Sequence, residues 1–280
     1  MYKRTDLAVE LEIDENIKGI TKREEKYGDI TVTGIEITSA EGEKALGKPK
    51  GKYLTVEFPD ILKISDFTPL EKSIKKALNT LIPKLPERVL VVGLGNTEIT
   101  PDSIGPFTAQ NILATRHIAG ELAENLGLKG LKSISVITPN VLGKTGIESV
   151  ELVSSVTQKV KPQLIIVIDA LAAGNSDRLF RTIQLCNTGI APGSGVNNSR
   201  KELNYNTLKA PVIAIGIPTV VDADTLCQDI TGQDIKGHSG LLVTSKDGDV
   251  LCRKICEILS RTLNTFLQPN IEPEVIFSLV

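Results

Sequence analysis

The chain has 280 residues, of which 41% are hydrophobic, and its 32 lysines and arginines nearly balance its 34 aspartates and glutamates. A chain of this length buries about three quarters of the surface that its unfolded form exposes, so a small fold held together by disulfides is excluded. The net charge of -2 argues against direct binding of nucleic acid, which requires an excess of basic residues. We expect one domain over residues 1–280.

No segment reaches the roughly 18 consecutive apolar residues of a membrane span, and the N-terminus lacks the apolar core of a signal peptide. We therefore expect a cytoplasmic protein without membrane contact. The four cysteines, Cys186, Cys227, Cys252 and Cys256, lack the paired spacing of a metal motif, and cytosolic thiols stay reduced. We interpret them as packing residues. A metal site at Cys252 and Cys256, four apart on a predicted helix, is the less favoured alternative.

The first predicted elements are two strands, residues 30–38 and 52–58, which are rich in β-branched and aromatic residues. The polar, glycine-containing stretch between them indicates antiparallel pairing, so residues 30–58 are predicted to form a small β appendage or edge. Thr68 and Pro69 then mark the start of a helix whose apolar residues recur at helical spacing until Pro83.

Short apolar runs and amphipathic stretches alternate through the rest of the chain. Five runs fit strands that are covered on both faces: residues 88–93, 133–137, 164–168, 179–185 and 211–217. Residues 107–126, 145–160 and 246–267 are predicted helices, the second opened by a capping box of Thr145 and Glu148. The alternation predicts an α/β fold with a doubly wound, mostly parallel sheet and helices on both faces.

In such sheets the functional site lies outside the carboxyl ends of the strands, which selects two aspartates. Asp102 follows a buried strand and a glycine turn, although its alternative role is to cap the next helix. A dinucleotide fingerprint is weak there, because Glu98 stands at the third glycine position. Asp169 ends the apolar run 164–168. Two neighbouring, desolvated carboxylates can share one proton and supply acid and base together.

Other residues at strand ends leave alternatives open. Asp222 follows a further strand, so a dyad of Asp169 with Asp222 fits the same pattern, as does a role for Asp222 at the start of a helix. The glycine-rich loop 191–200 can offer backbone N–H groups to a substrate main chain. Ser194 in this loop would need a histidine base, and neither histidine lies at a predicted strand end, so a carboxylate mechanism is favoured.

Five motifs occur in order along nearly the whole chain: Arg4-Thr-Asp-Leu-Ala-Val-Glu10, Val91-Val-Gly-Leu-Gly-Asn96 with Thr100-Pro-Asp102 and Gly105-Pro106, Ile168-Asp-Ala-Leu-Ala-Ala173, Pro192-Gly-Ser-Gly-Val196, and Ile213-Ala-Ile-Gly-Ile-Pro-Thr-Val-Val-Asp222. Together they resemble the germination protease (spore protease) family of spore-forming bacteria. The resemblance implies an atypical aspartic-type endopeptidase that degrades small acid-soluble spore proteins at germination. It also implies a homotetramer in the cytoplasm of the spore core.

The resemblance further implies roles for particular residues. The two essential aspartates of the family map onto Asp102 and Asp169. Family members are zymogens whose self-cleavage falls within the first motif, which implies a propeptide of residues 1–6 and a scissile bond between Asp6 and Leu7. A flexible arm can occupy the cleft in cis at high effective concentration. The acidic residue before the bond implies a basic subsite, for which the candidates are Arg116, Arg200 and Lys201.

We therefore expect Asp102 and Asp169 to be catalytic and no metal or cofactor to be needed. Six further residues are expected to bind the substrate: Gly95, Asn96, Gly193, Ser194, Gly195 and Asp222. The predicted sheet and glycine turn also resemble hydrogenase maturation proteases, in which acidic residues at comparable places bind nickel. A metal-dependent maturation-type peptidase is thus the alternative function, and a non-catalytic binding protein that has kept the fold is the second.

Overall fold

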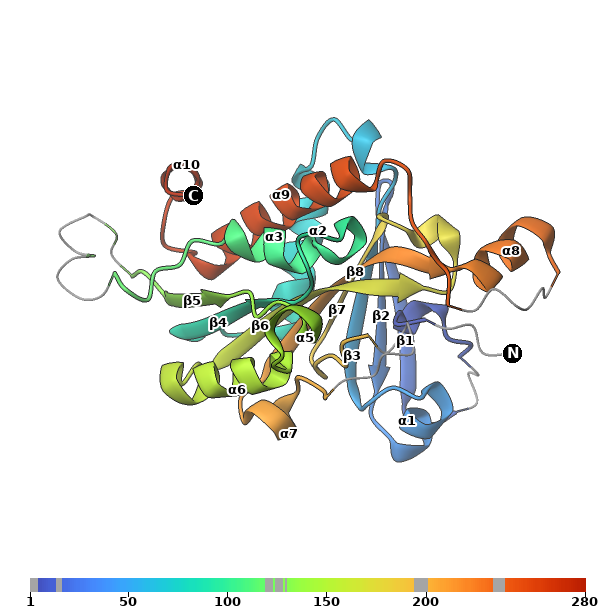
Figure 1. Cartoon of the computed structure of the whole chain (residues 1–280), viewed down its shortest axis with the longest axis horizontal. Coiled ribbons are helices and arrows are strands. Elements are labelled where there is room, and N and C mark those ends of the chain that lie inside the picture. Colours follow the sequence, from blue (N-terminus) through green and yellow to red (C-terminus); the bar gives the residue numbers. More distant parts are fainter. Residues whose placement is uncertain are drawn as a thin grey trace.

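The computed structural model of the chain describes residues 5–13, 17–118, 123, 128, 130–193, 201–233 and 240–280. These residues form one large mixed sheet with helices packed on it, which confirms the expected α/β class (Figure 1). Within the described part of the chain the sheet has nine strands, in the order β1-β2-β3-β7-β8-β6-β4-β5, with β9 (Leu242–Val243) paired to β8.

Four adjacent strands of this sheet run parallel: β5 (Ser133–Ile137), β4 (Arg88–Gly93), β6 (Leu164–Ala173) and β8 (Val212–Asp222). Nearly all residues of β4, β6 and β8 are buried. Strands covered on both faces need apolar side chains at successive positions, which explains their continuous apolar runs.

The remaining strands pair antiparallel. Beyond β8 lie β7 (Thr182–Cys186), β3 (Gly51–Glu57), β2 (Ile30–Ile37) and β1 (Ile20–Tyr27). The β2–β3 pairing was expected, but β1 was not, since its sequence is mostly charged. Its residues are largely exposed at the sheet edge, where charged side chains discourage pairing with other chains. With these antiparallel pairs beside the parallel ones, the sheet is mixed rather than mostly parallel as expected.

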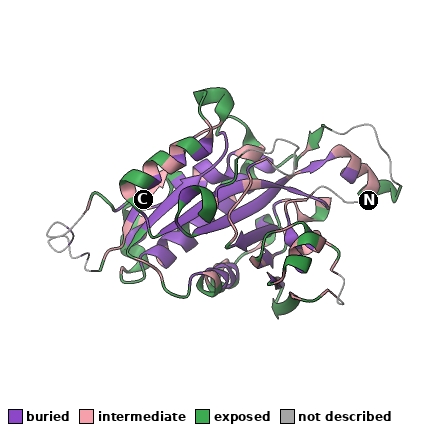
Figure 2. Cartoon of the chain, turned by 90° about the horizontal axis from the view of Figure 1, so that it is seen from below, coloured by how far each residue is buried: buried purple, intermediate pink, exposed green. Residues whose placement is uncertain are grey.

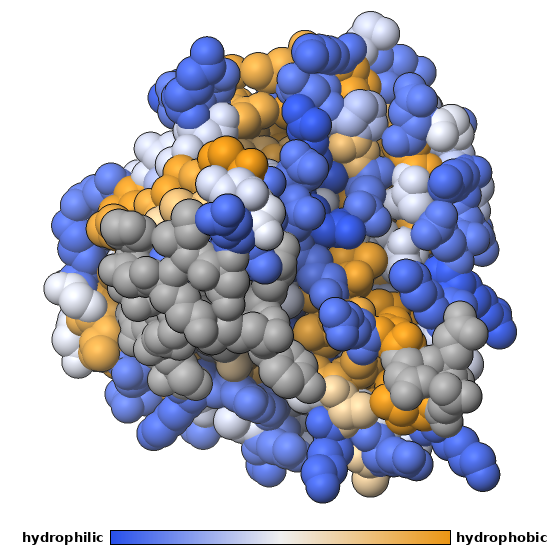
Figure 3. Space-filling view, turned by 90° about the vertical axis from the view of Figure 1, so that its right-hand side faces the viewer, coloured by the Kyte–Doolittle hydropathy of each residue, from blue (hydrophilic) through white to orange (hydrophobic). Residues whose placement is uncertain are grey.

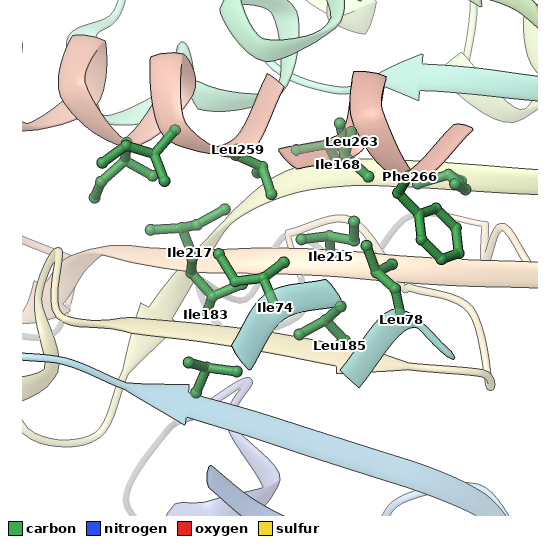
Figure 4. Packing of buried hydrophobic residues seen from close by; sticks show 14 of the residues in the cluster. Ile74, Leu78, Ile168, Ile183, Leu185, Ile215, Ile217, Leu259, Leu263 and Phe266 are labelled. Atoms are coloured by element: carbon green, nitrogen blue, oxygen red, sulfur yellow. The ribbon is translucent and has the colours of Figure 1, made fainter. Parts of the chain in front are cut away.

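Helices cover both faces of the parallel strands (Figure 1). On one face lie α2 (Thr68–Leu81), α3 (Ile104–Gln110) and α9 (Gly248–Leu267). On the other lie α6 (Ser149–Val160) and α7 (Tyr205–Leu208). Figure 4 shows apolar side chains of α2 and α9 directed at those of the strands, namely Ile74, Leu78, Leu259, Leu263 and Phe266 facing Ile168, Ile183, Leu185, Ile215 and Ile217.

Two predicted helices are wrong in extent. The helix expected over residues 107–126 begins earlier and ends at Gln110 as α3. The following N–H groups bind outside the helix: that of Leu113 donates to the Asn264 side chain at 2.9 Å, and those of Thr115 and Arg116 both donate to the Ile134 carbonyl at 3.0 Å. Those donors are therefore unavailable to helical partners. Residues 119–122 and 124–127 lie outside the described residues.

The second helix is divided. Gly146, with φ of 69°, ends the short helix α5 (Leu142–Thr145), and α6 starts at Ser149. The Thr145 hydroxyl accepts from the Ile147 N–H at 3.1 Å, and Glu148 occupies the N-cap position without a capping hydrogen bond from its side chain. The predicted capping box is therefore wrong, because a left-handed glycine closes one helix before the next begins.

Among the described residues, the other helices are α1 (Ala40–Leu46), α8 (Ala223–Thr231) and α10 (Pro273–Ser278), together with four short 3-10 helices. Buried residues concentrate in the strands and on the inner faces of the helices (Figure 2). On the face that includes α8, hydrophilic side chains predominate and apolar ones form separate patches (Figure 3). Among the described residues, no helix is both long and apolar enough to cross a membrane.

Candidate active site

The turn after β4 brings Asp102 back to the end of that strand. Gly95 has a φ of 120°, and a Cβ there would lie 2.0 Å from the main-chain oxygen of Asp102. Only glycine accommodates both the conformation and the close approach. The Asn96 N–H donates to the same oxygen at 3.0 Å. Asp102 itself ends a 3-10 helix (Thr100–Asp102). The Thr219 hydroxyl donates to the Pro101 carbonyl of this helix at 2.6 Å.

Asp169 reaches the same place from the neighbouring strand. It lies in β6 directly after Ile168, which pairs with Gly93 at the end of β4. The Leu94 N–H donates to the Ile168 carbonyl at 2.8 Å, so the turn stays in contact with β6. Strand β5 lies on one side of β4 and β6 on the other. The two aspartates thus flank the point where the strand order reverses, where α/β sheets bind their ligands.

Asp102 and Asp169 line one pocket of about 270 Å³. Asp169 is only 6% exposed. Of the other predicted site residues, Gly95, Gly193 and Asp6 also line this pocket.

Two of the predicted substrate-binding residues lie differently. Asn96 is buried, and its side chain accepts from the Glu98 N–H at 3.0 Å, so it shapes the turn. Asp222 caps α8 by accepting from the Asp224 N–H at 2.9 Å and does not line the pocket. That is the helix-start role considered for Asp222. Ser194, like Gly195, lies outside the described residues.

The N-terminal segment lies against the far end of β6. This strand continues past its last pairing with β4, which leaves the following residues without a β4 neighbour. The Asp6 N–H donates to the Ala172 carbonyl at 3.1 Å, and the Ala172 N–H donates to the Asp6 carboxylate at 2.9 Å. Leu7 is fully buried in an apolar cluster with Leu171 and Ala173. The Asp6–Leu7 bond is therefore firmly held.

Two side chains that the sequence did not single out contact this bond. Lys48 Nζ lies 3.0 Å and Gln184 Nε2 lies 3.1 Å from the carbonyl oxygen of Asp6. The Gln184 Oε1 accepts from the Ala8 N–H at 2.6 Å. The only sequence signal for Gln184 is its polar side chain within a buried strand, and nothing local distinguishes Lys48 from other lysines.

Further contacts anchor the segment beyond Leu7. The Glu10 carboxylate accepts from the Gly174 N–H at 2.7 Å and from the Thr5 hydroxyl. Arg178 Nε lies 3.3 Å from Glu10, and Arg178 Nη1 lies 2.5 Å from Glu57. Segments on both sides of the Asp6–Leu7 bond are thus tied to the sheet.

Two of the three residues expected to form a basic subsite for the acidic residue lie away from the cleft. Arg116 and Lys201 are exposed, and neither lines the pocket that contains Asp6 and the two aspartates. Arg200 lies outside the described residues. The Asp6 carboxylate instead meets a main-chain N–H of β6, because a strand that outruns its neighbour presents unpaired donors. Lys48 is the basic side chain bound to Asp6, at its carbonyl oxygen.

The cysteines and the acidic residues do not gather into a metal centre within the described ranges, where no group of three or more His, Cys, Asp or Glu side chains could hold an ion. Cys186, Cys252 and Cys256 are buried, and Cys227 is partly buried. Burial raises the pKa of Cys252 to about 12 and that of Cys256 to about 11. These thiols are therefore protonated near neutral pH, as expected of packing residues.

A family model and full-length relatives identify the same family. A family model described as germination protease matches residues 1–240. The chain is 40% identical to a germination protease of Clostridium tetani, over 99% of both chains, and 39% identical to one of Caldanaerobacter subterraneus subsp. tengcongensis, over 96% of this chain and 95% of the other. A structure of the NiFe hydrogenase maturation protease HycI from Thermococcus kodakarensis KOD1 matches 67% of this chain and 98% of its own, at 13% identity and a TM-score of 0.39.

Proposed function

The chain belongs to the germination protease family and is an endopeptidase. From this premise we propose that it hydrolyses small acid-soluble spore proteins at germination, after cleaving its own chain between Asp6 and Leu7. Residues 1–6 then form the propeptide, and the chain that starts at Leu7 is the processed enzyme. We further propose that it acts in the cytoplasm of the spore core as a homotetramer, as the family resemblance implies.

One observation carries this proposal: Asp6 lines the same pocket as Asp102 and Asp169. Asp6 thus lies 163 positions before Asp169 in the sequence, yet in the same cleft at the carboxyl ends of the parallel strands, where catalytic residues are expected. Its N–H donates to the Ala172 carbonyl and its carboxylate accepts from the Ala172 N–H. Leu7, the next residue, has an extended backbone, so the segment follows the edge of β6 as peptides that bind at a strand edge do. The bound segment has the geometry of a substrate held in cis.

The chemistry that fits the pocket is general acid–base catalysis by two carboxylates. Asp102 and Asp169 share one proton, so the ionised member takes a proton from water and the protonated member supplies one to the leaving amine. The buried position of Asp169 excludes bulk water from this exchange. Gly95, together with Gly193, lines the pocket beside them and can contact the substrate main chain.

The remaining predicted residues support the site or bind the substrate. Asn96 holds the turn that carries Asp102, and Asp222 fixes the end of β8 near the cleft. Ser194 and Gly195 belong to the loop that follows Gly193, and we propose that their backbone N–H groups bind the substrate. A protein substrate would enter the cleft once the propeptide has left it.

The test is incubation of the full chain, and of its Asp102→Asn and Asp169→Asn variants, with a purified small acid-soluble spore protein. Mass spectrometry would read the fragments and the N-terminus of the enzyme. We expect a new N-terminus at Leu7 and substrate cleavage with the wild-type chain, and rates at least about 1000-fold lower with either variant. Glu98→Gln, an exposed change in the same turn, is the control.

Two results would contradict the proposal. Full activity of either aspartate variant would remove that residue from catalysis. Cleavage that a chelator abolishes and added metal restores would instead favour the metal-dependent peptidase.

A further inference from the structure

The carbonyl oxygen of Asp6 is bound by two side-chain donors, one from the connection between α1 and β3 and one from β7. Lys48, which follows α1, approaches through Nζ at 3.0 Å, and Gln184 of β7 through Nε2 at 3.1 Å. Gln184 is 7% exposed and Lys48 is partly buried. A hydrogen bond from a charged donor is roughly twice as strong as a neutral one. This oxygen therefore has a stronger set of donors than binding an extended chain requires.

Gln184 also fixes the chain after the bond. Its Oε1 accepts from the Ala8 N–H at 2.6 Å while its Nε2 donates to the Asp6 oxygen. One amide side chain thus spans the peptide bond between Asp6 and Leu7. Because the two partners require opposite ends of the amide, they also determine its orientation.

Asp6 separates the donors from the aspartates. It lines the pocket of about 270 Å³ that contains Asp102 and Asp169, and also a neighbouring pocket of about 310 Å³ that contains Lys48 and Gln184. A water activated by the aspartates would therefore reach the carbonyl group from one pocket, while the carbonyl oxygen is bound by donors from the other.

We propose that Lys48 and Gln184 form the oxyanion-binding site of this peptidase, an inference that rests on the proposed cleavage between Asp6 and Leu7. Water gives a proton to the ionised aspartate and attacks the carbonyl carbon of Asp6. The π electron pair moves onto the carbonyl oxygen, where Lys48 Nζ and Gln184 Nε2 stabilise the negative charge. The pair then re-forms the double bond, the C–N bond breaks, and the nitrogen of Leu7 takes a proton from the protonated carboxyl.

The same two donors would act on a protein substrate in trans. Its acidic residue would take the place of Asp6, with the two following residues in the places of Leu7 and Ala8. Donors aimed at an oxyanion contribute about 100-fold to 1000-fold to kcat, whereas contacts made equally in the ground state change KM alone. This difference separates an oxyanion site from a binding contact.

The experiment compares Lys48→Met and Gln184→Glu with the wild type in the full chain. Gln184→Glu keeps the side-chain volume but removes the N–H donor, and Lys48→Arg restores a charged donor at position 48. Lys50→Met, an exposed change two residues along, is the matched control. The measurements are the self-cleavage rate, and kcat and KM on a synthetic peptide of residues 3–13. Thermal unfolding verifies that each variant is folded.

We expect a kcat about 100-fold lower for Lys48→Met, with KM within about twofold of the wild type, and partial recovery in Lys48→Arg. Gln184→Glu should lower both rates in the same way, while Lys50→Met should match the wild type. A second peptide, with Asn in place of the Asp6 residue, tests whether Lys48 acts on the side chain. The oxyanion role requires the kcat loss of Lys48→Met to persist with this peptide.

Other outcomes would overturn the inference. Unchanged kcat in folded Lys48→Met and Gln184→Glu, together with an inactive Asp102→Asn, would remove the oxyanion role and leave the proposed protease intact. A Lys48→Met defect confined to KM, and absent with the Asn peptide, would make Lys48 a specificity residue for the acidic side chain. A wild-type chain that cleaves neither itself nor the peptide would overturn the proposed function as well.

Discussion

The parallel and antiparallel halves of the sheet contribute different kinds of side chain to the cleft. The parallel half, with β4 and β6, supplies Asp102 and Asp169 from a tight turn and a buried strand. The antiparallel half, with β3 and β7, supplies Lys48 and Gln184, which contact the N-terminal segment. The two halves meet where β7 pairs with β8. Changes in the parallel half should therefore impair proton transfer by the aspartates. Changes at Lys48 or Gln184 should impair stabilisation of the charge on the Asp6 carbonyl oxygen, and other changes around the N-terminal segment should affect how that segment is held.

After the aspartate variants, a large effect is expected from Gly95→Ala in the parallel half. The new Cβ would meet the Asp102 oxygen at 2.0 Å, with φ at 120°, so the turn must shift and Asp102 with it. A displacement of about 1 Å in a reacting group lowers the rate about 100-fold. Gly146→Ala is the control, since its φ is also positive but no atom lies within 4 Å. Equal activity of the two variants would show that the turn does not position Asp102.

The next effect concerns the N-terminal segment. Leu7→Ala removes a fully buried side chain, which costs about 2–5 kcal/mol where the cavity does not collapse. Because the buried Leu7 side chain stabilises the docking of the N-terminal segment and not the rest of the fold, we expect faster hydrogen exchange over residues 5–13 and little change in global unfolding. The measurement is made in the Asp169→Asn background, which prevents self-cleavage. Val9→Ala, at a partly buried position, should have a smaller effect. Lower global stability by the full amount would show that the segment is integral to the fold.

Two helix caps provide a paired comparison between the halves. The Ser39 hydroxyl accepts from the Gly42 N–H at 2.9 Å at the start of α1, the helix that precedes Lys48. The Asn204 side chain caps α7 on the parallel half. Ser39→Ala and Asn204→Ala should each cost about 1 kcal/mol of unfolding free energy in urea titrations. Only Ser39→Ala should also slow self-cleavage, by a few-fold, since it loosens the segment that carries Lys48. Equal self-cleavage rates of the two variants would show that α1 does not affect the position of Lys48.

The last effect is a loss of stability in alkaline solution. The folded protein raises the pKa of Cys252 to about 12 and that of Cys256 to about 11, whereas unfolded thiols titrate near 8.5. The unfolded chain therefore loses these protons first. Their contribution is complete below about pH 8.5 and falls as the pH rises toward 11–12. Urea unfolding at pH 8 and pH 10 should show this decline in the wild type. A Cys252→Ala, Cys256→Ala double variant that declines equally would exclude the thiols as its cause.

Much of the fold could be predicted because the relevant signals are local. The apolar runs of β4, β6 and β8 predicted buried strands, and Thr68 with Pro69 marked the first residue of α2. Strand β1 was missed, because an exposed edge strand carries charges and has no apolar alternation. The end of α3 was missed because it depends on distant partners: the Asn264 side chain and the Ile134 carbonyl accept the N–H groups that follow the helix.

The sequence alone determined the family, the α/β class and the aspartates at the strand ends, because motifs and hydrophobic runs are properties of contiguous residues. Only the tertiary structure brought Asp6, Asp102 and Asp169 to one pocket and placed Lys48 and Gln184 on one carbonyl oxygen. These contacts join residues from 42 to 178 positions apart. Such contacts depend on the strand order and on how far β6 extends beyond β4, and neither can be predicted from a local sequence pattern.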